Sequence, residues 1–195
     1  TGRRVGKVEV CATSVSMKPA GAVNLTELDL GLGHVRCPPP SLVEAMRVEL
    51  HHHGQLTPVV AQRITGQRLQ LVDGFKRLRA AQRLDWKSLQ VAVLETPPDS
   101  PWSLMLSLNR GSGMTVVEQA LVLREMERSG LSQTRIAALV GRHKSWVSRR
   151  LGLVTALSPE LVEDLKLGLL HQGIARRLLV LPRGNQVDVA TAARA

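Results

Sequence analysis

The spacing of apolar residues divides the chain into two differently patterned parts. In the first part, short apolar runs alternate with segments whose apolar residues recur every three or four positions. Short runs are typical of strands, and the wider spacing is typical of helices. The pattern therefore predicts a helix at 41–54, strands at 58–64 and 69–72 joined by a glycine-containing turn at 65–68, a helix at 75–84 and a strand at 88–95.

The first predicted helix carries its own start and stop signals. Ser41 and Glu44 have the spacing of a capping box, in which each side chain accepts a hydrogen bond from the backbone of the other residue. Val43, Met46 and Leu50 fall on one face of this helix, and Gly54 follows its last turn, where glycine commonly ends a helix.

After the segment TPPDSP (96–101) the pattern predicts helices only. Thr115 and Glu118 form a second capping box, and the last clear helix begins at Ser158 with Pro159 in its first turn and ends at Gly168. The predicted helices of this part are 115–128, 132–141, 144–154 and 158–168.

These patterns predict an α+β protein with two domains. We expect a weakly structured N-terminus at 1–24, a small α/β domain at 25–104 and an all-helical domain at 105–195. The segment TPPDSP (96–101) interrupts the pattern between the domains, because proline removes a backbone donor and fixes the chain direction. A chain of 195 residues is long enough for two small cores.

Basic residues outnumber acidic residues, and the excess is uneven along the chain. The chain has 26 Lys and Arg against 16 Asp and Glu, a formal net charge of +10. Residues 1–104 carry 13 basic against 9 acidic residues, whereas residues 105–195 carry 13 against 7. No acidic residue lies between Glu127 and Glu160. This balance favours a polyanionic partner, nucleic acid before a membrane surface.

Cysteine and histidine positions do not predict a metal site. Cys11 and Cys37 are far apart and match no ligand spacing, and His51 to His53 are consecutive residues that point about 100° apart on a helix. No uncharged run approaches the roughly 18 residues of a membrane span. We therefore expect a cytoplasmic protein with reduced thiols, associated with the nucleoid if its partner is DNA.

The second part contains the spacing of a helix-turn-helix. This motif needs a small residue where two helices touch, a residue that tolerates a positive φ in the turn, and a buried β-branched residue in the second helix. Ala137, Gly141 and Val147 fit these three roles. An ordinary helical hairpin with a solvated basic face is the alternative, and the acid-free interval 128–159 favours DNA binding.

The two helices then predict a set of DNA-contacting residues. Polar and basic side chains on the second helix hydrogen-bond bases or phosphates in a major groove, and a helix N-terminus can hold a phosphate. The predicted DNA-binding residues are Ser132, Gln133 and Thr134 at the start of the first helix, Arg142 in the turn, and Lys144, Ser145, Ser148 and Arg149 on the second helix.

The segment VDGFKRLRA (72–80) places a glycine and several cations directly after a predicted strand. Backbone N–H groups at a helix N-terminus attract anions, and Gly74 allows a phosphate to approach the backbone closely. Arg77 can bind phosphate oxygens through two parallel hydrogen bonds. Phosphate binding is thus one interpretation, and an ordinary amphipathic helix with a solvated face is the other.

Both parts together resemble the ParB family of DNA-partition proteins over roughly residues 25–182. The ParB phosphate motif reads G-E-R-R-x-R-A, and GFKRLRA departs from it at Phe75 and Lys76 but retains Gly74, Arg77, Arg79 and Ala80. The segment HVR, ending at Arg36, is similar to the upstream ParB motif Q-P-R. The segment GQLTP (54–58) is similar to the ParB motif G-x-x-x-P. The segment 131–154 is similar to the ParB helix-turn-helix, and LLHQGIARRLL, which contains Arg176, to the helix after it.

The resemblance implies a DNA-binding protein whose loading or clamping at a specific site is controlled by CTP with Mg²⁺, in DNA partition or transcriptional control. It further implies self-association into a dimer or clamp, a partition ATPase as a candidate partner, and a slow CTPase activity that has no assigned catalytic residue. The residues that it implies for CTP are Arg36, Gly74, Lys76, Arg77, Arg79, Asn109 and Arg110, and it adds Arg176 to the DNA-binding set.

Other functions remain open at this point. The ParB motif E-N-x-x-R lacks its Glu here, and Asn109 and Arg110 do not have its spacing. A nucleotide-independent helix-turn-helix repressor with a degenerate N-terminal domain is therefore the main alternative. Two enzymes share the expected N-terminal fold, but Phe75 replaces the catalytic Cys of sulfiredoxins, and a free serine kinase does not need a helix-turn-helix.

Overall fold

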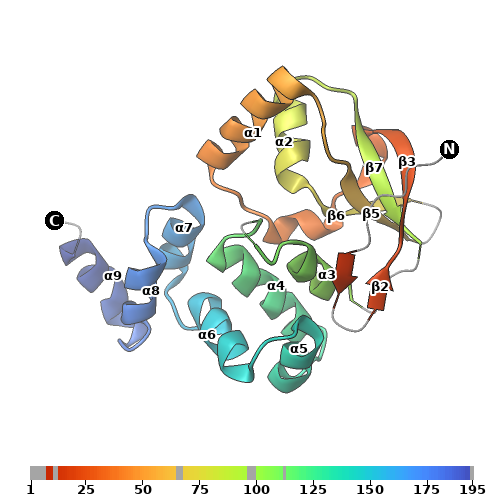
Figure 1. Cartoon of the computed structure of the whole chain (residues 1–195). Coiled ribbons are helices and arrows are strands. Elements are labelled where there is room, and N and C mark those ends of the chain that lie inside the picture. Colours follow the sequence, from red (N-terminus) through yellow and green to blue (C-terminus); the bar gives the residue numbers. More distant parts are fainter. Residues whose placement is uncertain (1–7, 11–12, 65–67, 96–99, 112, 194–195) are drawn as a thin grey trace. The chain divides into compact units, whose positions relative to one another are not determined.

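The structure, a computed structural model, describes residues 8–10, 13–64, 68–95, 100–111 and 113–193 (Figure 1). The predicted turn at 65–68 and the prolines of 96–101 thus lie largely outside the described residues, and so does Cys11. The chain divides into two compact units, an N-terminal unit (Thr1–Asn109) and a C-terminal unit (Arg110–Ala195). The predicted α+β class, an α/β domain followed by a helical domain, is confirmed.

The N-terminal unit is built on one mixed sheet of five strands (Figure 1). Its strand order is β3 (Met17–Asn24), β7 (Ser88–Leu94), β5 (Val59–Arg63), β6 (Leu69–Asp73) and β4 (Leu28–Asp29). The outer pair β3–β7 and the central pair β5–β6 are antiparallel, whereas β5–β7 and β4–β6 are parallel. A separate antiparallel pair joins β1 (Val8–Val10) and β2 (Thr13–Val15).

The central strands are largely buried, and Gln62 on β5 is the buried polar residue among their apolar side chains. Ala61, Leu71 and Val72 have no exposed surface, and α2 (Phe75–Arg83) follows β6 directly. Phe75, Leu78 and Ala81 form the buried side of α2, as the sequence predicts. Helix α1 (Pro40–His53) lies against α2 (Figure 1).

The start of α1 differs from the predicted capping box. The helix begins at Pro40 after Pro39, without a side-chain cap, because proline at the first helical position needs no N–H acceptor. The carboxylate of Glu44 instead accepts hydrogen bonds from Arg47 at 2.9 Å (Nε) and 2.7 Å (Nη2). Gly54 ends the helix at a positive φ of 66°, as expected.

The expectation of a weakly structured N-terminus over 1–24 is wrong for its last eight residues. Met17–Asn24 forms the edge strand β3, paired with β7 along its whole length. The short 3-10 segment η1 (Leu25–Glu27) connects β3 to β4, and a second one, η2 (Gly31–Val35), lies between β4 and α1.

The predicted boundary after residue 104 falls within a helix that the pattern did not predict. Helix α3 (Pro101–Leu108) begins after Ser100, whose side chain caps it, and its residues 103–107 are buried. The N-terminal unit therefore continues to Asn109.

The C-terminal unit contains helices and no strand among its described residues. It contains α4 (Val116–Arg128), α5 (Gln133–Val140), α6 (Lys144–Thr155), α7 (Pro159–Leu167), α8 (Gln172–Leu178) and α9 (Arg183–Ala192). The predicted capping box of α4 is present, with Thr115 N donating to Glu118 Oε2 at 2.7 Å and Glu118 N donating to Thr115 Oγ1 at 3.2 Å. No helix among the described residues is both long and apolar enough to cross a membrane.

A buried glutamine fixes α9, a helix that the sequence pattern did not reveal. Gln186 is 1% exposed, and its Oε1 accepts a hydrogen bond from Ser158 N at 2.8 Å. Its Nε2 donates to Ala156 O at 3.1 Å and to Leu181 O at 3.0 Å. Because Gln186 takes the Ser158 backbone N–H, α9 is tied to the segment between α6 and α7.

Candidate functional site

The turn between β6 and α2 requires glycine for two independent reasons. Gly74 has a φ of 104°, which a residue with a side chain rarely adopts. A Cβ atom at this position would also lie 2.5 Å from Cγ1 of Val59 on β5. Gly74 thus lets the turn pack against β5, and no side chain caps the N-terminus of α2 that follows.

The Arg77 side chain donates hydrogen bonds to backbone carbonyls of the N-terminal unit. Its Nη1 donates to Thr57 O at 2.8 Å and to Pro58 O at 2.6 Å, and its Nη2 lies 3.5 Å from Asp73 Oδ2. Burial lowers the pKa of Arg77, and the negative charge of Asp73 opposes that shift. The sequence pattern did not predict this role of Arg77, which connects the first turn of α2 to the segment before β5.

Asp73 joins two of the predicted phosphate-site residues. Asn109 is 7% exposed, and its Nδ2 donates to Asp73 Oδ1 at 2.9 Å and to Met105 O at 2.9 Å. The other carboxylate oxygen of Asp73 faces Arg77. The end of α3 and the start of α2 therefore meet at one carboxylate.

The remaining predicted phosphate-site residues have different surroundings. Arg79 Nη2 donates to Arg36 O at 2.6 Å, and Arg36 itself is 2% exposed. Lys76 is half-buried in the first turn of α2 and makes no hydrogen bond or ion pair with other described residues. Arg110 is exposed and belongs to the C-terminal unit. The structure thus brings Gly74, Lys76 and Arg77 together with Asn109.

Phe75 accounts for the main departure from the ParB phosphate motif. Its side chain is 2% exposed and packs against the backbone of η2, where a Cβ on Gly33 would lie 3.1 Å from Phe75 Cε1. Phe75 therefore belongs to the core of the N-terminal unit. The ParB phosphate motif has a Glu at this position, so an apolar side chain replaces a charged one. Among the described residues, no group of three or more His, Cys, Asp or Glu side chains is arranged to hold a metal ion.

The helix-turn-helix has the predicted internal geometry. Gly141 has φ 62° and ψ 44° at the end of α5, and Ala137 and Val147 are 6% and 0% exposed. Ile136 is also fully buried beneath the motif. The turn and the packing that the spacing predicts are therefore present.

The predicted DNA-binding residues at the start of α5 are not equivalent. Ser132 caps α5, its Oγ accepting a hydrogen bond from Arg135 N at 3.2 Å. Gln133 is half-buried and donates to Glu127 Oε1 at 3.2 Å, whereas Thr134 is exposed. Of these three residues, only Thr134 has its side chain fully available.

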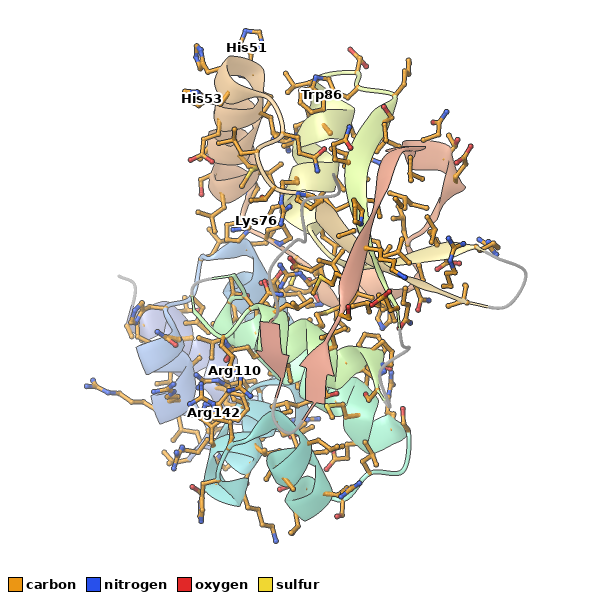
Figure 2. The ribbon with its side chains drawn as sticks, turned by 45° about the vertical axis from the view of Figure 1, so that its right-hand side comes forward. His51, His53, Lys76, Trp86, Arg110 and Arg142 are labelled. Atoms are coloured by element: carbon orange, nitrogen blue, oxygen red, sulfur yellow. The ribbon has the colours of Figure 1, made fainter. Side chains whose placement is uncertain are left out.

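Helix α6 presents its polar residues on the exposed side. His143 caps this helix, its Nδ1 accepting from Ser145 N at 3.2 Å. Ser145 is half-buried beside that cap. The exposed side chains of α6 include Lys144, Ser148 and Arg149. Arg142, labelled in Figure 2, is exposed in the turn before it.

Trp146 and Arg150 were absent from the predicted DNA-binding set. The guanidiniums of Arg142 and Arg150 lie 5.5 Å and 5.2 Å from the centre of the Trp146 ring. Arg150 Nε also donates to Gln119 Oε1 at 3.0 Å. The i, i+4 spacing of 146 and 150 was the available signal, because such residues lie on one face of a helix, whereas Arg142 lies in the turn before α6.

Each of the two units matches one domain of a single family, in the same order along the chain. Residues 40–109 match the ParB N-terminal domain, and residues 112–194 match the ParB HTH domain. The chain belongs to the ParB family. The resemblance stated from the sequence is thereby confirmed.

Relatives of this ParB-family chain are longer. It is 27% identical over 154 residues to a probable chromosome-partitioning protein ParB of Pseudomonas putida, covering 77% of this chain and 52% of that protein. It is 26% identical over 146 residues to a nucleoid occlusion protein of Geobacillus sp., covering 71% of this chain and 50% of that protein. The chain thus spans about half the length of these relatives.

A solved structure shares the fold of this ParB-family chain. A Pnob8-like ParB-N domain superposes with a TM-score of 0.56 at 14% sequence identity, covering 86% of this chain and 81% of that one. At this identity the likeness establishes the fold alone.

Proposed function

We propose that the protein binds a specific double-stranded DNA site through its C-terminal unit, in DNA partition or in transcriptional control. The observation that carries this proposal is a helix-turn-helix whose exposed side is basic over the acid-free interval 128–159. An idle helical surface normally mixes both signs of charge, whereas a DNA-binding surface does not.

In this proposal α6 is the recognition helix and lies in the major groove. Arg149 is the residue best suited to read a guanine, because arginine can donate two parallel hydrogen bonds to O6 and N7. Ser148 and Lys144 can hydrogen-bond bases or phosphates from the same exposed side. Thr134, at the N-terminus of α5, is placed to contact a phosphate.

We further propose that CTP binds at the turn between β6 and α2 and controls DNA loading. The N-terminus of α2 fits an anion, because its first backbone N–H groups have no helical acceptor and no side chain caps them. Lys76 adds a cation without another partner among the described residues. Mg²⁺ bound together with CTP would neutralise part of the negative charge of the CTP phosphates.

Other parts of this proposal extend to the whole protein. A CTP-dependent clamp needs self-association, and the ParB resemblance includes a slow CTPase and a partition ATPase as a partner. We assign no residue to CTP hydrolysis. We place the protein in the cytoplasm on the nucleoid because DNA is its proposed partner.

A nucleotide-independent repressor is the second candidate function. It is favoured by the burial of Phe75 in place of a polar motif residue and by Arg77, whose Nη1 is already bound to two carbonyls. Calorimetric titration with CTP, ATP, GTP and UTP in Mg²⁺, with and without DNA, separates the two. We expect selective binding of CTP, and the absence of any nucleotide binding by folded protein would favour the repressor.

Selection from a random pool of duplex DNA tests the DNA proposal while the target site is still unidentified. The wild-type protein is expected to enrich one sequence motif. The matched control carries Arg149→Ala, which leaves the charge of Lys144 and Arg142 in place. Equal recovery of all sequences by the wild-type protein would contradict specific binding.

A further inference from the structure

Two arginines of the C-terminal unit lie against one tryptophan, and two more act on one of them through their positive charge. Arg142 and Arg150 lie against the Trp146 ring, one before and one after it at four-residue spacing. Burial lowers the pKa of Arg150, and the positive charges of Arg176, Arg149 and Arg142 lower it further. Arg176 comes from α8, so the cluster joins two helices that are separate in sequence.

No carboxylate among the described residues neutralises this arginine cluster (Arg142, Arg149, Arg150 and Arg176). None of the four forms an ion pair with a described residue, and Arg150 donates its side-chain hydrogen bond to the neutral amide of Gln119. Mutual repulsion drives such guanidiniums apart in the free protein. An aromatic face attracts cations, so the ring of Trp146 opposes this repulsion for the two guanidiniums that lie against it.

The occupied ring argues against base stacking by Trp146. Two guanidiniums already lie within 5.5 Å of the ring centre, and Trp146 itself is half-buried. A guanidinium stacked on a ring still has N–H donors at its edge, and those donors suit phosphate oxygens. The Trp146 ring is therefore placed to hold the guanidiniums of Arg142 and Arg150, and not a base.

We propose that Trp146 is a positioning residue that orders Arg142 and Arg150 as a paired clamp for neighbouring phosphates of the DNA backbone. Arg176 extends the same strip from α8. This inference rests on the proposed DNA binding and deepens it by separating two tasks. The clamp supplies affinity that is independent of sequence, whereas Ser148 and Arg149 on α6 discriminate bases.

Salt dependence distinguishes the two tasks in an experiment. Affinity for the selected duplex and for an unrelated duplex of equal length is measured from about 50 to 200 mM salt, with wild type, Trp146→Leu and Trp146→Phe. Each phosphate contact contributes about 0.9 to the slope of log affinity against log salt. Trp146→Leu is expected to weaken binding of both duplexes by about tenfold and to reduce the slope by about 1 to 2. Trp146→Phe, which keeps a ring face, should retain most of the slope.

The same data contain the results that would overturn the inference. If Trp146→Leu changes the preference between the two duplexes but not the slope, Trp146 reads bases. If affinity and slope are both unchanged, the ring does not position a clamp. If the wild-type protein binds neither duplex, the proposed function fails, and not only this inference.

A second variant keeps the test valid if Trp146→Leu does not fold. Arg142 is exposed in the turn, so Arg142→Gln removes one arm of the clamp without disturbing the core. We expect it to lower the slope by about 1 for both duplexes, and an unchanged slope would contradict the clamp. Where Trp146→Leu folds, Arg142→Gln should have less effect in that background, and strictly additive effects of the two substitutions would contradict the positioning role.

Discussion

Replacing Arg77 with alanine tests whether this residue holds the phosphate turn together. In the structure its guanidinium donates to Thr57 O at 2.8 Å and to Pro58 O at 2.6 Å, and it lies 3.5 Å from Asp73 Oδ2. Hydrogen bonds from a charged donor each contribute about 1.5–3 kcal/mol. The ion pair with Asp73 is long and partly exposed, and it contributes about 1 kcal/mol or less.

The expected loss is smaller than the sum of these contributions, because water can reach the partly exposed carbonyls in the variant. We expect Arg77→Ala to lower the free energy of unfolding of the N-terminal unit by about 3 kcal/mol. For a unit of this size, such a loss lowers the thermal midpoint by about 12–24 °C. Nucleotide binding should fall as well, whereas simple DNA binding by the C-terminal unit should persist.

Tryptophan fluorescence can follow the N-terminal unit alone. Trp86 and Trp102 lie in that unit, so a Trp146→Phe background removes the signal of the C-terminal unit. The matched control is Lys76→Ala, because Lys76 is the adjacent cation and has no hydrogen-bond or ion-pair partner among the described residues. It should weaken CTP binding with less than about 0.5 kcal/mol change in stability. Equal midpoints for Arg77→Ala and Lys76→Ala would show that Arg77 does not fasten the turn.

Three further predictions concern other contacts. Gln186→Leu should destabilise the C-terminal unit by about 2–4 kcal/mol in urea unfolding, because it leaves the buried N–H of Ser158 and two partly buried carbonyls without their partner, whereas exposed Asn185→Ala should not. Asp73→Asn should strengthen CTP binding severalfold in calorimetry, because it removes a carboxylate beside the turn; weaker binding would count against a phosphate there. Arg149→Ala should weaken specific DNA binding by about 1–3 kcal/mol, and an unchanged salt titration would place Arg149 outside the interface.

Local signals made much of the fold predictable. The strands β5, β6 and β7 and the helix α2 have a clear apolar period, and the structure places them within one or two residues of the predicted bounds. The helix-turn-helix was predictable because Ala137, Gly141 and Val147 each answer a requirement of backbone conformation or packing that belongs to the motif itself.

Elements stabilised by distant partners left no such signal. Strand β3 contains Pro19 and Gly21, has a bulge between them and is mostly exposed, so it has no alternation of apolar and polar residues. Helix α9 includes Gly184 and Asn185, which are weak helix formers, and its anchor is the tertiary contact of Gln186. Pairing with β7 decides the first element and the buried contact with the α6–α7 segment decides the second, and neither is visible in a short window of sequence.

The candidate sites divide in the same way. The glycine at 74 and the cations around it were evident, but the contacts of Arg77 depend on Thr57 and Pro58, about twenty residues earlier in the chain. Trp146 and the two arginines at its ring are close neighbours in the sequence. Arg176, in contrast, comes near Arg150 only because of how α8 packs. Residue types thus indicated the chemistry, and the fold decides which donors remain available.

Sequence-specific recognition of DNA is tested most directly by selecting duplexes with the wild-type protein and then measuring its affinity for the enriched duplex and for a scrambled one. Specific recognition predicts a single enriched motif, bound at least about a thousandfold more tightly than the scrambled duplex at physiological salt. Equal affinity for both duplexes, with the same salt slope, would contradict it and leave a basic helical surface without sequence recognition.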